Sequence, residues 1–142
     1  DREGIDPASA DLGGVKKIIK DMRQGGLLGC LPDQVPGRGE GVWVPFFGRP
    51  AFTMSFPMKV ARQFNADIFI AYAQRLEGKG WKIYIQQLHL DLNGNAEHDA
   101  ALMNQEIEKI VMKVPEQYIW NYNRFKGLNH YLEVLKKKET RS

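Results

Sequence analysis

The sequence predicts an α/β protein in which helices flank a mixed, mostly parallel β-sheet. Apolar residues recur with helical spacing in two long segments, and short apolar runs bounded by glycine or proline lie beside them. Helices interleaved with buried strands are typical of layered α/β folds. A chain of 142 residues that is 43% hydrophobic is long enough to bury one core without disulfide bonds.

The first elements predicted along the chain are a helix and a buried strand. The helix is indicated by an apolar stripe at positions i, i+3, i+4 and i+7: Val15, Ile18, Ile19 and Met22. Asp11 is its expected N-cap, and Gly25 and Gly26 end it. The wholly apolar run at 27–31 favours a strand buried on both faces. Cys30 lies in that run and is expected to be a small core residue rather than a nucleophile.

The middle of the chain is predicted to hold a loop, an aromatic segment and a short helix. Residues 32–42 should form the loop, because they contain two prolines and several glycines. The aromatic segment 42–47 follows, with a turn at residues 48–50. A helix is expected over residues 56–64, where Pro57 fits the first turn.

Two further strands and a long helix are predicted in the second half. Residues 68–73 are interpreted as a buried strand, parallel to the strand at 27–31. Residues 81–86 alternate large apolar with polar side chains and should pair antiparallel with that second strand, through the turn at 78–80. A helix over residues 97–114 is indicated by an apolar stripe: Met103, Ile107, Ile110, Val111 and Val114.

The net positive charge of the chain comes from its last part. The formal charge is +3, and residues 115–142 contribute six basic and three acidic side chains. The last residues, 127–142, therefore form a basic tail, which either stays solvated or meets anionic lipid head groups. No nucleic-acid-binding motif accompanies it, so nucleic acid is not expected as a partner.

Metal, cofactor and nucleophile chemistry are not expected in this chain. The single cysteine excludes a multi-cysteine zinc site, and no two histidines have zinc-type spacing. His98 adjoins Asp99 but is expected to be an exposed helix residue, because neighbours on a helix point in different directions. No run approaches the roughly 18 apolar residues of a membrane span.

The loop and the aromatic segment after it hold the first candidate binding residues. Asp33 and Gln34 follow the first predicted strand at its carboxyl end, where open α/β sheets place ligands. Arg38 suits pairing with a phosphate, and Phe46 and Phe47 offer apolar surface. An amphiphile with an anionic head and an acyl chain would fit this combination. The alternative is a capped turn, a solvated arginine and ordinary core aromatics.

A second candidate stretch covers residues 115–126, with the sequence PEQYIWNYNRFK. Its aromatic residues alternate with amides before two cations. Such a stretch either packs against the sheet or lies at a membrane interface, with Tyr and Trp at head-group depth. The pattern alone leaves both arrangements open.

Four motifs, in order and spacing, resemble the lipid A biosynthesis acyltransferase family of Gram-negative bacteria. L-P-D-Q at residues 31–34 precedes G-x-G-x-x-V-P-F-F-G at 39–48. Arg75 follows the second predicted strand, D-A-x-x-M-N-x-x-I-E occupies residues 99–108 of the long helix, and the stretch at 115–126 completes the set.

This resemblance implies an acyltransferase of late lipid A biosynthesis with a glycerolipid-acyltransferase-like fold. A fatty acyl chain would pass from acyl carrier protein, or acyl-CoA, to a hydroxyacyl group of the Kdo–lipid A precursor, without a cofactor. The enzyme would work at the cytoplasmic face of the bacterial inner membrane. Residues 1–126 are expected to be the carboxyl-terminal portion of that domain, followed by the basic tail.

The catalytic motif of the family is a histidine followed, after four residues, by Asp or Glu, with the histidine as general base. Five positions after His89, His98 and His130 stand Gly94, Met103 and Leu135. The motif is therefore expected upstream of Asp1, and the chain alone should be inactive. The alternative is a non-catalytic lipid-binding or scaffolding remnant of the same fold.

Carried over residue by residue, the resemblance implies these substrate-binding positions: Asp33, Gln34, Arg38, Phe46, Phe47, Arg75, Asn104, Glu116, Gln117, Trp120 and Arg124. On this hypothesis Arg38 and Arg124 face phosphate or the acidic carrier protein, while Asp33 and Gln34 shape the floor of the site.

Overall fold

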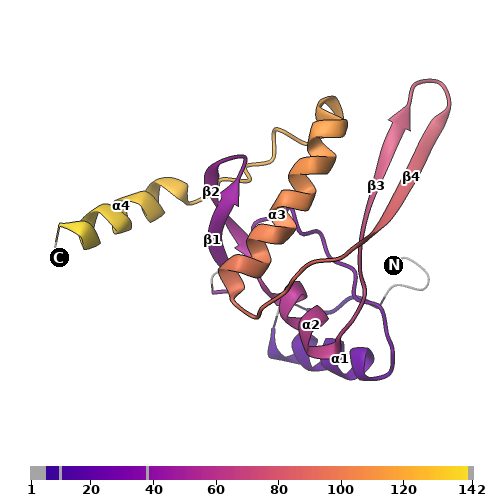
Figure 1. Cartoon of the computed structure of the whole chain (residues 1–142), viewed down its shortest axis with the longest axis horizontal. Helices are drawn as coiled ribbons and strands as arrows, with labels where there is room; N and C mark the ends of the chain where they lie inside the picture. The colour runs from indigo at the N-terminus through magenta and orange to yellow at the C-terminus, as the bar shows by residue number, and fades with distance from the viewer. Residues whose placement is uncertain (1–5, 10, 38, 141–142) are drawn as a thin grey trace.

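The computed structural model describes residues 6–9, 11–37 and 39–140 (Figure 1). Arg38, one of the predicted binding residues, lies outside the described residues. In chain order the elements are α1 (Leu12–Arg23), β1 (Gly41–Phe46), β2 (Arg49–Met54), α2 (Phe56–Phe64), β3 (Ile68–Leu76), β4 (Gly80–Leu88), α3 (Ala96–Lys113), the short 3₁₀ turn η1 (Pro115–Gln117) and α4 (Leu128–Glu139).

The strands form two separate antiparallel hairpins, so the predicted mostly parallel sheet is wrong. β1 pairs with β2 and β3 pairs with β4, and no strand ladder joins the two hairpins in the described part of the chain. The mixture of helices and strands is compatible with the predicted α/β class, and the expected pairing of β3 with β4 is confirmed.

The expected first strand, residues 27–31, is irregular chain. Leu27 is 96% exposed and Leu31 is 61% exposed. A buried strand needs a neighbour that satisfies its backbone N–H and C=O groups, and no described strand pairs with this run. Cys30 is consequently exposed, in contrast to its predicted place in the core.

The helices predicted from apolar stripes and caps are confirmed. α1 begins after Asp11, whose carboxylate accepts the N–H of Gly14 at 2.9 Å. α2 carries Pro57 in its first turn, where the missing N–H costs no hydrogen bond. α3 begins after Asn95, whose side chain accepts the N–H of His98 at 2.8 Å. These caps satisfy N–H groups that have no partner within the helix.

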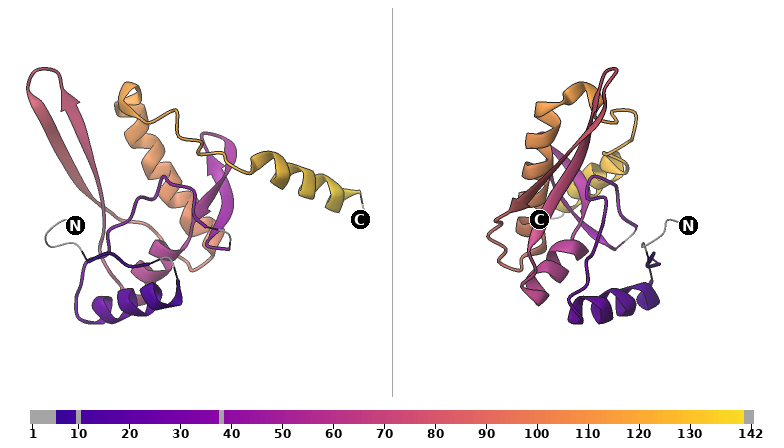
Figure 2. Two further views of the ribbon diagram at one scale, coloured as in Figure 1. Left: turned by 180° about the vertical axis from the view of Figure 1, so that it is seen from behind. Right: turned by 90° about the vertical axis from the view of Figure 1, so that its right-hand side faces the viewer.

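The core lies where α3 crosses the β1–β2 hairpin and α2 (Figures 1 and 2). Its buried apolar side chains come from all of these elements and from the end of β4: Phe46, Ala51, Met58, Leu88, Met103, Ile107 and Val111. Because one stripe of α3 supplies three of these residues, α3 is the element on which both hairpins and α2 depend.

The β3–β4 hairpin projects from the body of the molecule, on the other side of α3 from β1–β2 (Figures 1 and 2). Tyr72 and Tyr84 stack across the two strands with ring centroids 4.8 Å apart. The predicted burial of β3 on both faces is wrong, because its side chains alternate between half-buried and exposed. The outer face of the hairpin is largely apolar and includes Ile83 and Ile85 of β4, which are 68% and 70% exposed.

Part of the basic tail is helical, although no helix was predicted there. α4 extends away from the rest of the molecule, opposite the β3–β4 hairpin (Figure 1). None of the helices in residues 6–9, 11–37 and 39–140 is both long enough and apolar enough to cross a bilayer.

Candidate functional site

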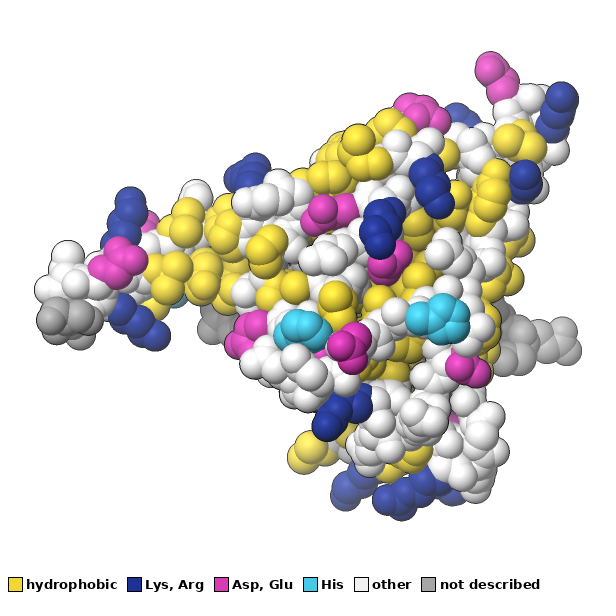
Figure 3. Space-filling view, viewed as in Figure 1, with side chains coloured by type: hydrophobic (Ala, Val, Ile, Leu, Met, Phe, Trp, Pro, Cys, Tyr) yellow, Lys and Arg dark blue, Asp and Glu magenta, His cyan; other side chains and the backbone are white. Residues whose placement is uncertain are grey.

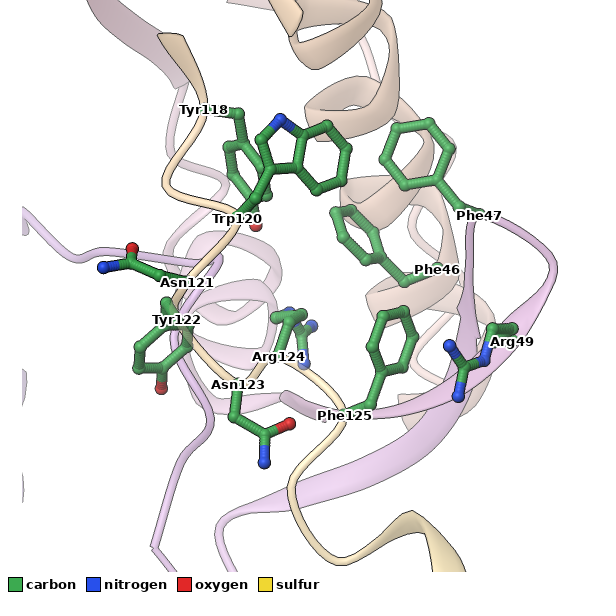
Figure 4. Close-up of a pocket in the computed structure, with 10 residues that line it drawn as sticks. All are labelled: Phe46, Phe47, Arg49, Tyr118, Trp120, Asn121, Tyr122, Asn123, Arg124 and Phe125. Carbon is green, nitrogen blue, oxygen red and sulfur yellow. The ribbon is translucent and has the colours of Figure 1, made fainter. Parts of the chain in front are cut away.

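An aromatic pocket lies between the turn of the β1–β2 hairpin and the segment after η1 (Figure 4). Its volume is about 540 Å³, within the range of pockets that hold small organic ligands. The lining residues come from two segments that are far apart in sequence: Phe46, Phe47, Arg49, Tyr118, Trp120, Asn121, Tyr122, Asn123, Arg124 and Phe125. Four predicted site residues, Phe46, Phe47, Trp120 and Arg124, are brought together here.

Phe46 forms the inner wall of this aromatic pocket. It is 1% exposed, and its ring contacts Phe47 edge-on at a centroid distance of 4.9 Å. The rings of Tyr118 and Phe125 lie 6.4 and 6.2 Å from it. Trp120, on the facing segment, lies 4.9 Å from Tyr118. Such a concentration of rings offers apolar surface to a hydrocarbon ligand.

Phe47 is held in a strained turn by a carboxylate that the sequence reasoning did not single out as a site residue. Its φ is +47°, in the left-handed region that costs a bulky residue free energy, and Gly48 follows with φ +72°. Two successive positive φ angles are what a tight two-residue hairpin requires. Glu108 on α3 accepts the N–H of Phe47 at 2.7 Å, so this charge-assisted bond stabilises the turn that places the ring.

Arg49 supplies positive charge to the aromatic pocket. The residue is exposed, and its guanidinium lies 4.5 Å from the centroid of the Phe125 ring. A cation over an aromatic face is attracted by the negative face of the ring. From the sequence, Arg49 is predicted only as part of a turn, because Gly48 and Pro50 on either side of it are turn residues.

Arg124 lines the pocket but is almost wholly buried, and its guanidinium binds the chain itself. The residue is 3% exposed. Its guanidinium donates to the carbonyl of Phe52 at 2.7 Å, to Thr53 Oγ1 at 2.7 Å and to Asn104 Oδ1 at 3.3 Å. The hypothesis that Arg124 faces phosphate or the acidic carrier protein does not fit this burial. Its Nε is buried without a hydrogen-bond partner in the described residues.

Burial lowers the pKa of Arg124, while the nearby charges of Tyr118 and Asp33 act in the opposite direction. The same environment acts on Tyr118: burial raises the pKa of its hydroxyl, and the carboxylate of Asp33 raises it further. Asp33 therefore lies close enough to both groups to influence their ionisation, and its own side chain is half-buried.

Asn104 joins Arg124 to the hairpin. Its Nδ2 donates to the carbonyl of Pro45 at 2.8 Å and to Thr53 Oγ1 at 3.1 Å. The network of Asn104, Thr53 and Arg124 thus ties α3, β1–β2 and the segment 118–125 together. Asn104 is fully buried and reaches no ligand directly, so it is a positioning residue for the pocket.

Asp33 and Gln34 lie in a loop, because the strand that was predicted to end before them does not form. Gln34 is exposed, and its N–H donates to the carbonyl of Leu31 at 3.2 Å. The next residue, Val35, donates its N–H to the hydroxyl of Tyr122 at 2.8 Å. This bond holds the loop beside the aromatic pocket, although neither predicted residue lines it.

Arg75 and Gln117 form a separate contact away from the aromatic pocket. The N–H of Arg75 donates to Gln117 Oε1 at 2.8 Å, and Gln117 Nε2 donates to the carbonyl of Arg75 at 3.1 Å. Gln117 therefore forms two hydrogen bonds with the backbone of β3, and these hold the start of the segment 118–125 in place. Glu116, beside it in η1, is exposed.

The His98–Asp99 pair lies at the first turn of α3, away from the pocket. His98 is an exposed helix residue, as predicted. The expectation that its side chain points away from that of Asp99 is wrong, because His98 Nδ1 lies 3.1 Å from Asp99 Oδ1. Burial alone would raise the pKa of Asp99, but the His98 contact and the N–H groups of Asn93 and Gly94 outweigh it and leave the pKa lowered. The carboxylate closes the loop before α3, which is a structural role.

The pocket can hold an apolar chain beside a cation. No cluster of three or more His, Cys, Asp or Glu side chains suited to a metal was found within the described ranges. Sequence reasoning missed the pocket residues Arg49, Tyr118, Tyr122 and Phe125 as individual positions. The alternation of aromatics and amides at 115–126 was the signal that could have found the last three.

Replacing Arg124 by Ala is expected to lower the free energy of unfolding by about 3 kcal/mol. The change removes the donor of the Phe52 carbonyl and of Asn104 Oδ1, takes one of two donors from Thr53 Oγ1 and opens a cavity. Urea unfolding followed by circular dichroism measures the effect. Arg49→Ala is the control and should cost under about 1 kcal/mol, because that guanidinium is exposed. Equal losses for both variants would refute the structural role of Arg124.

Replacing Asp99 by Asn is expected to lower the free energy of unfolding by about 1–2 kcal/mol near pH 7. Because the folded state lowers the pKa of Asp99, its contribution is complete above the unfolded pKa of about 3.9 and is lost as the pH falls through the folded value. The difference between wild type and Asp99→Asn should therefore stay constant from pH 7 to about pH 5 and shrink as the pH falls below about 4 in urea titrations. Asp91→Asn, at an exposed position, is the control. A difference that stays constant with pH would contradict the prediction.

Comparison with known proteins agrees with the resemblance seen in the motifs. The family model of the bacterial lipid A biosynthesis acyltransferases matches residues 3–127. The chain is 33% identical over 109 residues to a lipid A biosynthesis acyltransferase of Haemophilus influenzae, covering 75% of this chain and 34% of that protein. The chain is also 33% identical over 116 residues to the lipid A biosynthesis lauroyltransferase of Escherichia coli. That match covers 79% of this chain and 38% of the lauroyltransferase. The chain is 33% identical over 114 residues to the lipid A biosynthesis myristoyltransferase of the same organism. That match covers 75% of this chain and 34% of the myristoyltransferase.

The chain thus spans about a third of the length of the curated relatives it matches. The matched region includes both segments of the aromatic pocket and the whole of the Asn104–Thr53–Arg124 network. On the strength of the family match, the chain belongs to the bacterial lipid A biosynthesis acyltransferase family.

Proposed function

We propose that this chain contributes to an acyltransferase of lipid A biosynthesis, in which its aromatic pocket binds the apolar part of the donor or acceptor lipid. The observation that carries the proposal is the family match over residues 3–127. The relatives are named for the transfer of lauroyl, myristoyl and palmitoleoyl groups. A fatty acyl group is a hydrocarbon chain, and hydrocarbon binds where aromatic surface is gathered.

The pocket supports this proposal through its shape and its charge. Phe46, Phe47 and Trp120 present ring faces or edges to one cavity (Figure 4). Arg49 places a guanidinium beside the same cavity. Apolar surface next to a cation suits a molecule that has an acyl chain and an anionic head. Arg49, rather than Arg124, is therefore the cation that we assign to phosphate or to an acidic donor protein.

The reaction that we propose is acyl transfer from acyl carrier protein to a hydroxyacyl group of the Kdo–lipid A precursor. It would take place at the cytoplasmic face of the bacterial inner membrane. In this proposal the histidine and carboxylate that activate the acceptor hydroxyl lie in a part of the enzyme outside these 142 residues. The residues of this chain bind and orient the lipid and exclude water from it.

A second candidate function is lipid binding without catalysis. It is favoured by one observation, that none of the three histidines is followed by an acidic residue at the family spacing. The two functions predict the same occupant for the aromatic pocket but differ in turnover. If the chain binds the lipid precursor but supports no acyl transfer, alone or joined to the rest of a relative, it is the non-catalytic remnant.

A chimeric enzyme tests the proposed function. The part of the Escherichia coli lauroyltransferase that matches this chain is replaced by residues 3–127, and the chimera is expressed in cells that lack the native enzyme. Mass spectrometry of the extracted lipid A should show the gain of one acyl chain. A chimera that accumulates as a folded protein but adds no acyl chain would contradict the proposal.

Two variants of the chimera test the pocket itself. Trp120→Ala should reduce the rate of transfer by about tenfold, because it removes a ring that faces Phe47 across the cavity and packs against its neighbour Tyr118. Leu27→Ala is the control, since Leu27 is 96% exposed and lies outside the pocket. If both variants retain the full rate, the aromatic pocket does not bind the lipid.

A further inference from the structure

Helix α4 lies beyond the part of the chain that the family accounts for. The family match ends at residue 127, and α4 begins at Leu128. The aromatic pocket and its buried network are complete without α4. α4 extends away from the body of the molecule (Figures 1 and 2). Because the family match does not include it, its function has to be inferred from its own residues.

The body holds α4 at one end. Gly127 precedes it with φ +84°, a conformation that favours glycine, and Leu128 is 7% exposed. Tyr131 stacks on Trp43 of β1, with ring centroids 4.4 Å apart and planes at 10°. These contacts fix the direction in which α4 leaves the body.

The apolar stripe of α4 continues past this anchored end. Leu128, Tyr131, Leu132 and Leu135 follow one another at i, i+3, i+4 and i+7, which places them on one side of the helix. Leu132 and Leu135 are 38% and 37% exposed. Figure 3 shows hydrophobic side chains, in yellow, along the part of the surface that α4 forms. A helix of 12 residues is marginally stable in water without tertiary packing. The outer half of α4 therefore leaves its leucines partly open to contact with another surface.

Positive charge lies at the same end of the helix. Lys136, Lys137 and Lys138 follow Leu135 directly, and residues 127–142 contain four basic and two acidic side chains, a net charge of +2. Glu133, one of the acids, lies on the opposite side of the helix from Leu135, since two residues correspond to about 200° of rotation. Leucines with lysines next to them fit a lipid surface that has acyl chains below anionic head groups.

We propose that α4 lies on an anionic lipid bilayer, with Leu132 and Leu135 inserted at the head-group boundary. Lys136, at the flank of the leucine stripe, pairs with lipid phosphates, and Lys137, on the far side of the helix, adds positive charge near the surface. The inference deepens the membrane-surface location within the proposed function. It assigns that location to one helix, which is absent from the family match. A protein partner or a second copy of this chain would cover the leucines without requiring anionic lipid.

Vesicle binding by the purified 142-residue chain tests the proposal. Flotation with phosphatidylglycerol–phosphatidylcholine vesicles is compared with flotation on phosphatidylcholine alone. The wild-type chain should favour the anionic vesicles, and salt should weaken the preference. Lys136→Gln with Lys137→Gln should weaken anionic binding by up to about 25-fold, that is, at most about fivefold for each lysine. The matched control is Lys16→Gln with Lys20→Gln on α1, at two exposed lysines one turn apart, which should change nothing.

A fluorescent label separates α4 from the other apolar surfaces, including the outer face of the β3–β4 hairpin. An environment-sensitive fluorophore is attached at Leu135→Cys or at Glu133→Cys, each in a Cys30→Ser background. Anionic vesicles should shift the emission to the blue at position 135 and leave position 133 unchanged. Equal responses at the two positions, or none, would overturn the proposal.

The α4 variant Leu132→Asp with Leu135→Asp gives the remaining comparison. It should lose binding to both kinds of vesicle while sedimentation without lipid stays the same. A change in self-association in the absence of vesicles would show that the leucines cover a second copy of the chain, and would also overturn the proposal. None of these measurements uses acyl transfer, so failure here is distinct from failure of the chimeric enzyme.

Discussion

The buried guanidinium of Arg124 is the interaction on which the rest of the structure depends. It lies between the β1–β2 hairpin and α3 and donates hydrogen bonds to both. A charge so fully buried is costly unless hydrogen bonds compensate for the lost water. Thr53 and Asn104 provide that compensation, and the segment 118–125 is thereby fixed against the hairpin. Without this network the two walls of the aromatic pocket would have no common support.

The buried network of Arg124, Thr53 and Asn104 also explains why some pocket residues offer surface to a ligand while others mainly support the pocket. Arg124, although it lines the cavity, and Asn104 are buried and support its walls through their hydrogen bonds. Phe47, Trp120 and Arg49 line the cavity with more exposed side chains. Glu108 adds a second support, because it holds the left-handed turn at Phe47. Family motifs therefore mix residues that touch a ligand with residues that position others, and geometry separates the two groups.

Local patterns predicted the helices well and the sheet poorly. Periodicity and caps are properties of neighbouring residues, so α1, α2 and α3 could be located from residues such as Asp11 and Pro57. Strand pairing depends on distant residues, and the apolar run at 27–31 carried no sign that a partner strand was missing. Phe46, Phe47, Trp120 and Arg124 could be predicted from motifs. Arg49 could not, because its role arises from contact with Phe125, 76 residues along the chain.

The most direct test of the central claim is whether the aromatic pocket binds a hydrocarbon chain. A fatty acid brominated near its methyl end is titrated into the purified chain while tryptophan fluorescence is recorded, because bromine quenches the indoles that it approaches. We expect quenching that Trp120→Phe largely removes and that Trp81→Phe, on the distant hairpin, leaves in place. Quenching that survives in Trp120→Phe and disappears in Trp81→Phe would contradict the account.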